Sequence, residues 1–174
     1  MEKKSYIEKL LIYFFIFAFI GWTLETLYGF TVLGHFTKRG FLYGPICPIY
    51  GYAAIIMITF INKYKASYFK IFINSIIIFS LFEYIAGYIL EALFCIRLWD
   101  YTNDFMNLNG RISIFYSIIW GIIAIIFVKF MYPFAEKIIN YILDKIPKII
   151  TSITVYIIFS IYIIDTFFSF FKWN

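Results

Sequence analysis

Five long runs of apolar residues follow one another along the chain, separated by short stretches that hold most of the charged residues. Each run is close to the ~20 residues with which an α-helix crosses the hydrocarbon core of a bilayer. The pattern predicts five membrane-spanning helices, at residues 8–32, 45–61, 69–94, 113–131 and 148–171. We therefore expect an all-α fold, a polytopic transmembrane helix bundle that forms a single domain over residues 1–174.

Two further segments are too polar to span. Residues 134–146 follow Pro133 and place apolar side chains on one helical face and charged or amide side chains on the other. This pattern predicts an interfacial helix on the cytoplasmic leaflet. Residues 97–111 mix aromatic and polar side chains, and the pair Asn109-Gly110 indicates a turn. We expect this second segment at the outer interface.

The composition selects a membrane protein. Hydrophobic residues make up 63% of the chain, charged residues 14%, and the mean hydropathy is +0.86, whereas a soluble domain is roughly half apolar and a quarter charged. The formal net charge of +5 does not indicate nucleic-acid binding, because the basic residues gather at the ends of the apolar runs. There they anchor helices at the bilayer surface. The expected partner is therefore the lipid bilayer and not a nucleic acid.

The distribution of Lys and Arg predicts the orientation. Ten of the 15 fall at the amino terminus, between the second and third spans, and between the fourth and fifth, and the other five fall on the opposite side. Because cytoplasmic loops carry the excess of basic residues, we expect a multi-pass plasma-membrane protein with a cytoplasmic amino terminus. Five crossings then place the carboxyl terminus outside, unless the last run lies along the interface.

Acidic residues inside the apolar runs say most about function. One ionised carboxylate at the centre of a spanning helix costs roughly 2.5–3.5 kcal/mol on insertion scales. Glu25, Glu83 and Asp165 all fall inside predicted spans, and a rise of ~1.5 Å per residue places all three in the outer half of the bilayer. Intramembrane carboxylates are candidates for functional sites by default.

Small residues accompany these carboxylates. Glu91 lies two helical turns beyond Glu83, with Gly87 between them on one face of the third predicted span. The first span repeats the pattern, because Glu25 has a glycine four residues away on each side. Since small residues let another helix approach a carboxylate closely, we expect the two faces to meet.

An irregular segment lies between the first two spans. Residues 38–51 are rich in glycine and proline, so a regular helix cannot start cleanly there. Broken backbone at membrane depth is tolerated only where protein buries it or where it lines a watery cavity. We therefore hypothesise an outward-facing ligand-binding pocket whose inner polar groups are Glu25 and Glu83. Its rim is predicted to consist of Arg39, Glu91, Arg97, Asp100 and Arg111.

A purely structural role for the same residues stays open. The glutamates could pair with the arginines, or accept hydrogen bonds from Tyr28, Tyr84 and Tyr88, and so hold helices together without binding a ligand. Asp165 could likewise hydrogen-bond a hydroxyl of its own helix, that of Thr166 or Ser169, and do nothing more.

A membrane-embedded enzyme is a less favoured alternative. Cys47 and His35 have no recognised catalytic spacing. A metal site built from His35 with Glu25, Glu83 and Glu91 is conceivable because carboxylates bind hard cations, yet no tight ligand motif supports it. We expect no catalytic residues, no metal and no cofactor.

Several short motifs together resemble a known family. They are Gly21-Trp22 with Glu25, residues 39–51, Glu83-Tyr84 with Glu91, Arg97-Leu98-Trp99-Asp100-Tyr101, Asn109-Gly110-Arg111-Ile112, and Trp120-Gly121. Together these motifs cover about two thirds of the chain. In them the chain resembles the small bacterial membrane proteins called putative type IV ABC-transporter components. Lys38 and Leu98 depart from that pattern, in which Asn and a second aromatic residue are common. The last span matches little of it.

The resemblance implies a permease-like or substrate-binding membrane component of a transporter. The chain contains no G-x-x-x-x-G-K-[ST] phosphate loop, so an ATP-driven transporter would need a separate ATPase polypeptide as partner. That partner could dock on residues 134–146, for which membrane anchoring is the simpler role. The alternative function is a membrane-bound interaction or sensory subunit without flux, and a homo-oligomer is compatible with either.

Overall fold

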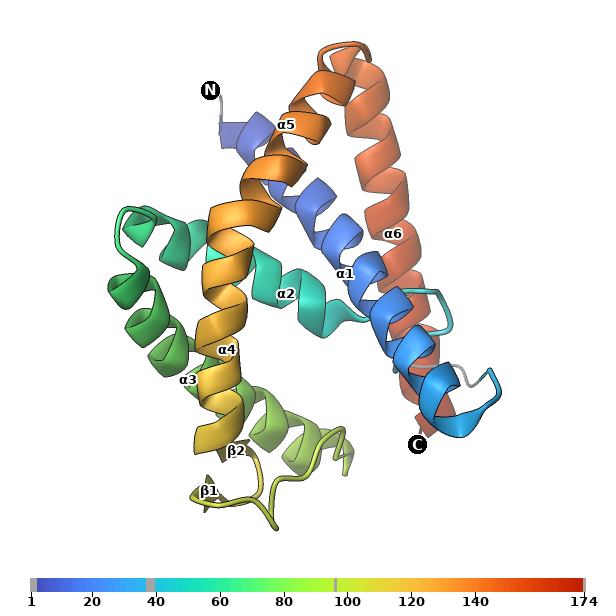
Figure 1. Cartoon of the computed structure of the whole chain (residues 1–174). Helices are drawn as coiled ribbons and strands as arrows, with labels where there is room; N and C mark the ends of the chain where they lie inside the picture. The colour runs from blue at the N-terminus through green and yellow to red at the C-terminus, as the bar shows by residue number, and fades with distance from the viewer. Residues whose placement is uncertain (1–2, 37–39, 96, 174) are drawn as a thin grey trace. The chain divides into compact units, whose positions relative to one another are not determined.

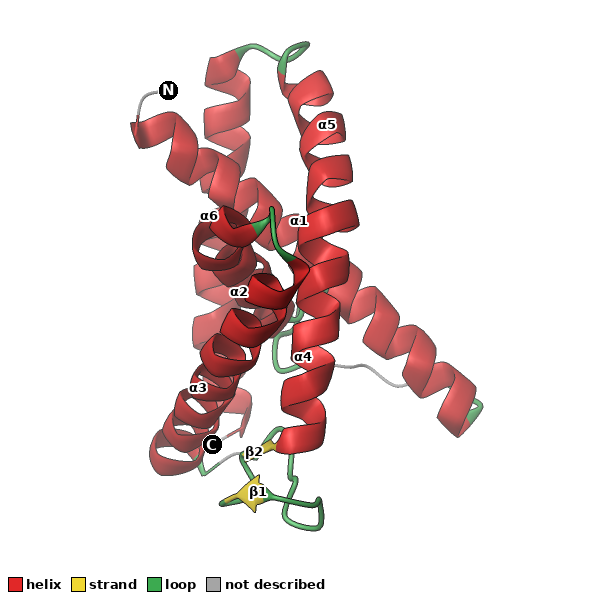
Figure 2. Ribbon diagram, turned by 60° about the vertical axis from the view of Figure 1, so that its left-hand side comes forward, coloured by secondary structure: helices red, strands yellow, loops and turns green. Residues whose placement is uncertain are grey.

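The computed structural model describes residues 3–36, 40–95 and 97–173. Helices account for most of them, and one short hairpin supplies the strands (Figure 2). The helical elements are α1 (Lys3–Leu33), α2 (Pro48–Ile56), η1 (Met57–Ile61), η2 (Asn62–Tyr64), α3 (Tyr68–Phe94), α4 (Ile114–Ile126), η3 (Phe127–Met131), α5 (Tyr132–Leu143) and α6 (Lys148–Trp173). The strands are β1 (Asn107–Leu108) and β2 (Ile112–Ser113). The all-α prediction is confirmed.

Within the described part of the chain, four helical stretches are long and apolar enough to cross a bilayer. They are Tyr6–Leu33, Tyr68–Ala92, Ile114–Leu143 and Lys148–Phe171. Each contains most of one of the five predicted spans. Their length and apolar composition are those of a membrane protein.

The second predicted span, residues 45–61, is not a full-length helix, and on this point the prediction is wrong. α2 has nine residues and the π-helical turn η1 adds five, which at ~1.5 Å per residue falls short of the ~30 Å hydrocarbon core. Two prolines explain the late start. Pro45 has no N–H to give a helix interior, whereas Pro48 occupies the first helical position, where proline is favoured.

The predicted interfacial helix, residues 134–146, is helical as α5 up to Leu143, but it continues the preceding helix and does not stand apart from it. α4, η3 and α5 follow one another without a break, and together they form one apolar helical stretch from Ile114 to Leu143. Pro133 lies in the first turn of α5, directly after the π-helical turn η3. The wider π turn accommodates a residue that cannot donate a backbone hydrogen bond, so the proline does not end the helix.

The chain groups into two compact units. Unit 1 comprises Met1–Ile56 and Lys137–Asn174, and it contains α1, α2 and α6. Unit 2 comprises Met57–Glu136, and it contains η1, α3, the hairpin, α4 and η3. This division does not test the single domain predicted from the sequence, which stays a prediction.

In unit 1, α1 packs against both α2 and α6 (Figure 1). Glycines permit the close approach of α1 and α2, because the ring of Tyr50 lies against Gly21 and Phe14 lies against Gly51. Phe14 also meets Tyr162 of α6 edge to face, with 5.4 Å between the ring centroids. Small residues and aromatic rings thus form the core of this unit.

In unit 2, α3 runs along α4 (Figure 1). The rings of Phe79 and Trp120 stack with their centroids 4.6 Å apart. The hydroxyls of Ser80 and Ser117 lie 2.7 Å apart and hydrogen-bond across the two helices. The π-helical turns η1 and η3 contact each other. Rings and paired hydroxyls therefore hold the two helices together.

Replacing Gly51 by alanine is expected to destabilise unit 1 by ~1–3 kcal/mol, as overpacking in a closed core does. The added Cβ would lie 2.8 Å from the backbone oxygen of Phe14, which cannot move aside as a side chain can. The free energy of unfolding in detergent micelles measures the effect. Ser160→Ala on the exposed side of α6 is the control, expected within about 0.5 kcal/mol of wild type. Equal stability of Gly51→Ala and wild type would contradict this account of the helix contact.

Candidate functional site

Glu91, near the end of α3, binds two arginines at once. Its Oε1 lies 2.6 Å from Nη2 of Arg97, and its Oε2 accepts from Nη2 and Nε of Arg111 at 2.6 and 3.1 Å. Arg97 also pairs with Asp100 at 3.1 Å. Two acids and two bases therefore form one network, which we call the charged cap: Glu91, Arg97, Asp100 and Arg111.

The face of α3 below Glu91 is shaped to receive Arg111. The aliphatic stem of Arg111 packs over Gly87, where an added Cβ would lie only 3.3 Å from its Cγ. Its guanidinium group lies over the rings of Tyr84 and Tyr88, 5.5 and 5.4 Å from their centroids. Glycine thus provides the room, and the tyrosines provide electron-rich faces for the cation.

The loop that carries the two arginines is held by its own hydrogen bonds. Tyr101 N–H donates to the carbonyl of Gly110 at 2.8 Å, and the indole N–H of Trp99 donates to the carbonyl of Arg111 at 2.9 Å. Asn109 and Gly110 both have a positive φ, of 55° and 66°, as a type I′ hairpin turn requires. The turn predicted from this Asn-Gly pair is confirmed, and it joins β1 to β2.

Asp100 is fixed within this loop. Its Oδ1 accepts from the hydroxyl of Thr102 and from the Thr102 N–H, the latter at 2.9 Å, while Oδ2 faces Arg97. These bonds favour the ionised carboxylate. Donation by the Thr102 hydroxyl and N–H, followed by the Arg97 guanidinium, lowers the pKa of Asp100 to about 2.

Glu83 lies two turns before Glu91 on α3 and is only 4% exposed. Tyr101 of the loop donates its hydroxyl to Oε1 at 3.4 Å, and the indole of Trp120 interacts with the same carboxyl group. Among the described residues, Oε2 has no hydrogen-bond partner of ordinary geometry. Burial and the negative charge of Glu83 raise the pKa of the Tyr101 hydroxyl, which keeps it a donor. Glu83 is therefore a buried acid whose second oxygen has no hydrogen bond of ordinary geometry among the described residues.

Glu25 occupies a different setting in unit 1. The hydroxyl of Tyr50 donates to its Oε1 at 2.8 Å, and the Tyr50 ring reaches this position because Gly21 has no side chain. Just before α2, the backbone N–H of Cys47 donates to the carbonyl of Ala18 at 3.0 Å. The irregular segment before α2 thus packs on α1 close to the carboxylate.

Asp165 of α6 contacts the same irregular segment. Its two carboxylate oxygens accept the consecutive backbone N–H groups of Tyr43 and Gly44, at 2.9 and 2.7 Å. Ser169, one turn further along α6, donates to Asp165 at 3.0 Å. The sequence suggested the contact with Ser169 but not the capture of the loop. The only feature of the sequence that pointed to this position was an aspartate in an apolar helix with a hydroxyl group one turn away.

The predicted site residues fall into three groups. Glu91, Arg97, Asp100 and Arg111 come together in the charged cap, and Tyr101 connects this loop to Glu83. Glu25 belongs to unit 1 and Glu83 to unit 2, so their convergence in one pocket stays a prediction. Arg39 lies outside the described residues.

The two tyrosines that donate hydrogen bonds to Glu25 and Glu83 differ from those expected. Tyr50 and Tyr101 donate to Glu25 and Glu83, whereas the sequence pointed to Tyr28, Tyr84 and Tyr88. Tyr84 instead accepts a hydrogen bond from the Asn109 side chain at 3.0 Å. Both donors come from segments distant in the sequence, so helical spacing could not identify them.

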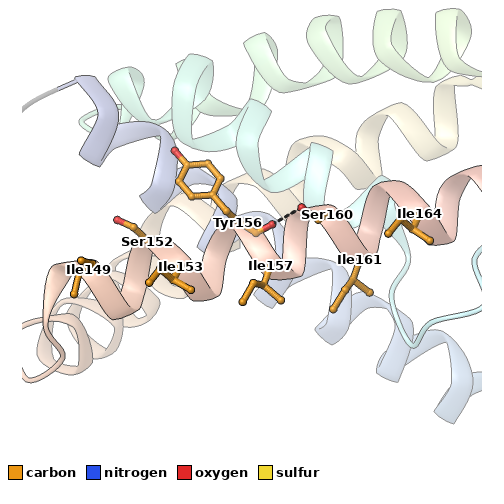
Figure 3. Close-up of a pocket in the computed structure, with 8 residues that line it drawn as sticks. All are labelled: Ile149, Ser152, Ile153, Tyr156, Ile157, Ser160, Ile161 and Ile164. Atoms are coloured by element: carbon orange, nitrogen blue, oxygen red, sulfur yellow. Dashed lines mark hydrogen bonds between the residues drawn. The ribbon is translucent and has the colours of Figure 1, made fainter.

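A groove of about 640 Å³ follows α6, and it is apolar in character. Figure 3 shows Ile149, Ile153, Ile157 and Ile161 along one side of the helix, while the hydroxyl of Ser160 bonds the carbonyl of Tyr156 on the same helix. No carboxylate or basic group lines this groove. Its isoleucines suit contact with lipid chains rather than recognition of a polar ligand. Within the described ranges, no cluster of three His, Cys, Asp or Glu side chains could hold a metal ion.

The chain matches a family model described as "Putative ABC-transporter type IV" over residues 12–170. The match extends from α1 to α6 and contains both units' carboxylates. It confirms the resemblance inferred from the sequence motifs. Neither a curated protein nor a solved structure matches the chain.

The charged cap predicts a specific pH dependence. Because the pKa of Asp100 is lowered from 3.8 to about 2 on folding, its stabilising contribution is complete above the unfolded pKa and is lost as the pH falls through about 2. Asp100→Asn should therefore melt at a lower temperature than wild type near neutral pH, and the difference should shrink toward pH 2. Thermal unfolding in detergent across this range measures it. Asp104→Asn in the same loop is the matched control, and a difference that is constant with pH would contradict the assignment.

Proposed function

We propose that this chain, which belongs to the putative ABC-transporter type IV family, is the membrane subunit of a bacterial plasma-membrane system for transport or ligand capture. The amino terminus is assigned to the cytoplasm, on the excess of basic residues on that side. The carboxyl group of Glu83 carries the proposal, because it is buried in an apolar helix and one of its oxygens has no hydrogen bond of ordinary geometry among the described residues.

An unused acceptor at this depth favours binding over a purely structural role. A buried polar group that only holds helices together is normally satisfied by its neighbours, as Ser80 and Ser117 are. Leaving a carboxylate oxygen without a hydrogen bond in an apolar setting is costly. A ligand, a cation or a proton that reaches Glu83 would remove that cost, which is the general basis for function at intramembrane acids.

We assign Glu83 as the inner polar group of the proposed pocket in unit 2, with Glu91, Arg97, Asp100 and Arg111 as its rim. Glu25 of unit 1 is proposed as a second polar group on which transport depends. The arginines present planar forks suited to anionic groups, and Tyr101 connects the rim to the inner acid by donating to Glu83.

The energy source is assigned to another polypeptide. The sequence has no phosphate-binding loop of the G-x-x-x-x-G-K-[ST] type, so the chain is proposed to work with a separate ATPase and not as an enzyme itself. Membership of the transporter family supports such a partner.

A second candidate is an interaction or sensory subunit without flux. The pairing of both Glu91 oxygens, with Arg97 and Arg111, favours this candidate, because a salt-bridged cap offers a rigid surface to which a partner protein can bind. Flux measurements separate the two candidates.

Glu25→Gln and Glu83→Gln should abolish transport while the protein still inserts. Each change keeps the side-chain volume but removes the negative charge and one acceptor oxygen. A strain that lacks the gene is complemented with wild type or a variant, and mass spectrometry compares the solutes in cells and medium. Glu136→Gln, whose glutamate accepts from Tyr132 one turn away, is the matched control. Wild-type solute distribution in both variants would reject the assigned roles.

An ATP-hydrolysing polypeptide should co-purify with the chain. Gentle detergent extraction of native membranes that contain an affinity-tagged chain is expected to yield ATPase activity, and the untagged chain serves as the control. Mass spectrometry then identifies the partner. A tagged preparation that contains a kinase or regulator and no ATPase would favour the sensory alternative.

A further inference from the structure

The segment between α1 and α2 reaches the middle of α1. Cys47 at its end donates its backbone N–H to the carbonyl of Ala18, the central residue of Lys3–Leu33. α1 ends at Leu33, and the described residues 40–47 are not helical. Non-helical backbone at such depth needs protein partners for its N–H groups, because hydrocarbon offers none.

Asp165 supplies those partners to two consecutive residues. Oδ1 accepts the N–H of Tyr43 at 2.9 Å and Oδ2 accepts the N–H of Gly44 at 2.7 Å. Gly44 has no side chain to block this approach, since an added Cβ would lie 2.9 Å from Oδ2. Ser169, which is fully buried, lies 3.1 Å from the same Tyr43 nitrogen and donates to Oδ1.

The segment is coupled to Glu25 through its far end. Three residues after Gly44, Cys47 is fixed to α1, and Tyr50 in the first turn of α2 donates to Glu25. The side chain of Cys47 is only 5% exposed, and its sulfur lies 3.0 Å from the position of a Cβ at Gly40. Releasing the loop at Tyr43 and Gly44 would therefore loosen the packing that holds Cys47 and Tyr50.

We infer that Asp165 is a positioning residue, a latch on α6 that holds the loop 40–47 against α1 and thereby sets the place of Tyr50 and Glu25. A carboxylate is the side chain that suits this role, because each of its oxygens accepts one of the two neighbouring N–H groups. An asparagine of the same shape offers one acceptor and turns its NH₂ group toward the second N–H. The consequence for Glu25 rests on the proposed function, whereas the holding of the loop does not.

The two cysteines of the chain provide a direct test. Cys47 is buried and Cys95 is exposed, so Cys95→Ser leaves one slowly reacting thiol inside the latched loop. In this background, the rate at which N-ethylmaleimide labels Cys47 in native membranes reports the opening of the loop. Asp165→Asn is expected to raise that rate at least about tenfold, and Ser169→Ala to raise it by a smaller factor, because only one of the donors is lost.

Ser160→Ala is the matched control on the same helix. Its hydroxyl donates to the carbonyl of Tyr156 on the same helix (Figure 3) and not to the described residues of the loop, so labelling of Cys47 should stay at the wild-type rate. Wild-type labelling of Asp165→Asn would overturn the latch. If Asp165→Asn does not accumulate in the membrane, Ser169→Ala decides, and an unchanged rate there would overturn it as well.

The same variants separate this inference from the proposed function. Faster labelling together with a changed solute distribution supports both. Faster labelling with an unchanged solute distribution keeps the latch and counts against the transport role of Glu25.

Discussion

The absence of water from the hydrocarbon core governs the structure more than any single contact does. Each backbone N–H placed there must find an acceptor within the protein. Helices meet this demand by themselves, but the segment before α2 cannot, because Pro45 and Pro48 keep it irregular. The carboxylate of Asp165, which is half-buried, meets the demand instead by accepting hydrogen bonds from three donors.

Charge follows a different rule outside the spanning helices. The charged cap stands at the end of α3, where its carboxylates and guanidinium groups are partly exposed and can pair at low cost. Two turns further into α3, Glu83 is buried, and its carboxyl group interacts with Tyr101 and Trp120. On one face of α3, the carboxylate of Glu91 is fully paired, whereas that of Glu83 has one oxygen without a hydrogen bond of ordinary geometry among the described residues. This difference is the reason to propose ligand binding at Glu83.

Sequence periodicity was sufficient for features that depend on local rules. Apolar runs gave four of the helices, Asn109-Gly110 gave the hairpin turn, and helical spacing gave the face that joins Glu83, Gly87 and Glu91. It failed where a distant segment decides the outcome. The partners of Asp165 are backbone N–H groups, which leave no mark on residue identity, and Tyr50 and Tyr101 approach from elsewhere in the chain. Pro133 suggested a helix break, yet the π turn η3 before it lets the helix continue.

The two π-helical turns also determine where the chain can lose a residue without disturbing its helices. A π turn is an α-helical turn widened by one inserted residue, so deleting one residue from Met57–Ile61 or Phe127–Met131 could restore regular winding. A deletion elsewhere in these helices would instead rotate everything that follows by about 100° relative to the preceding helix. The two π turns are therefore the places in these helices where the loss of one residue is easiest to accommodate. Because η1 and η3 contact each other, such a loss in one turn changes the surface that packs against the other.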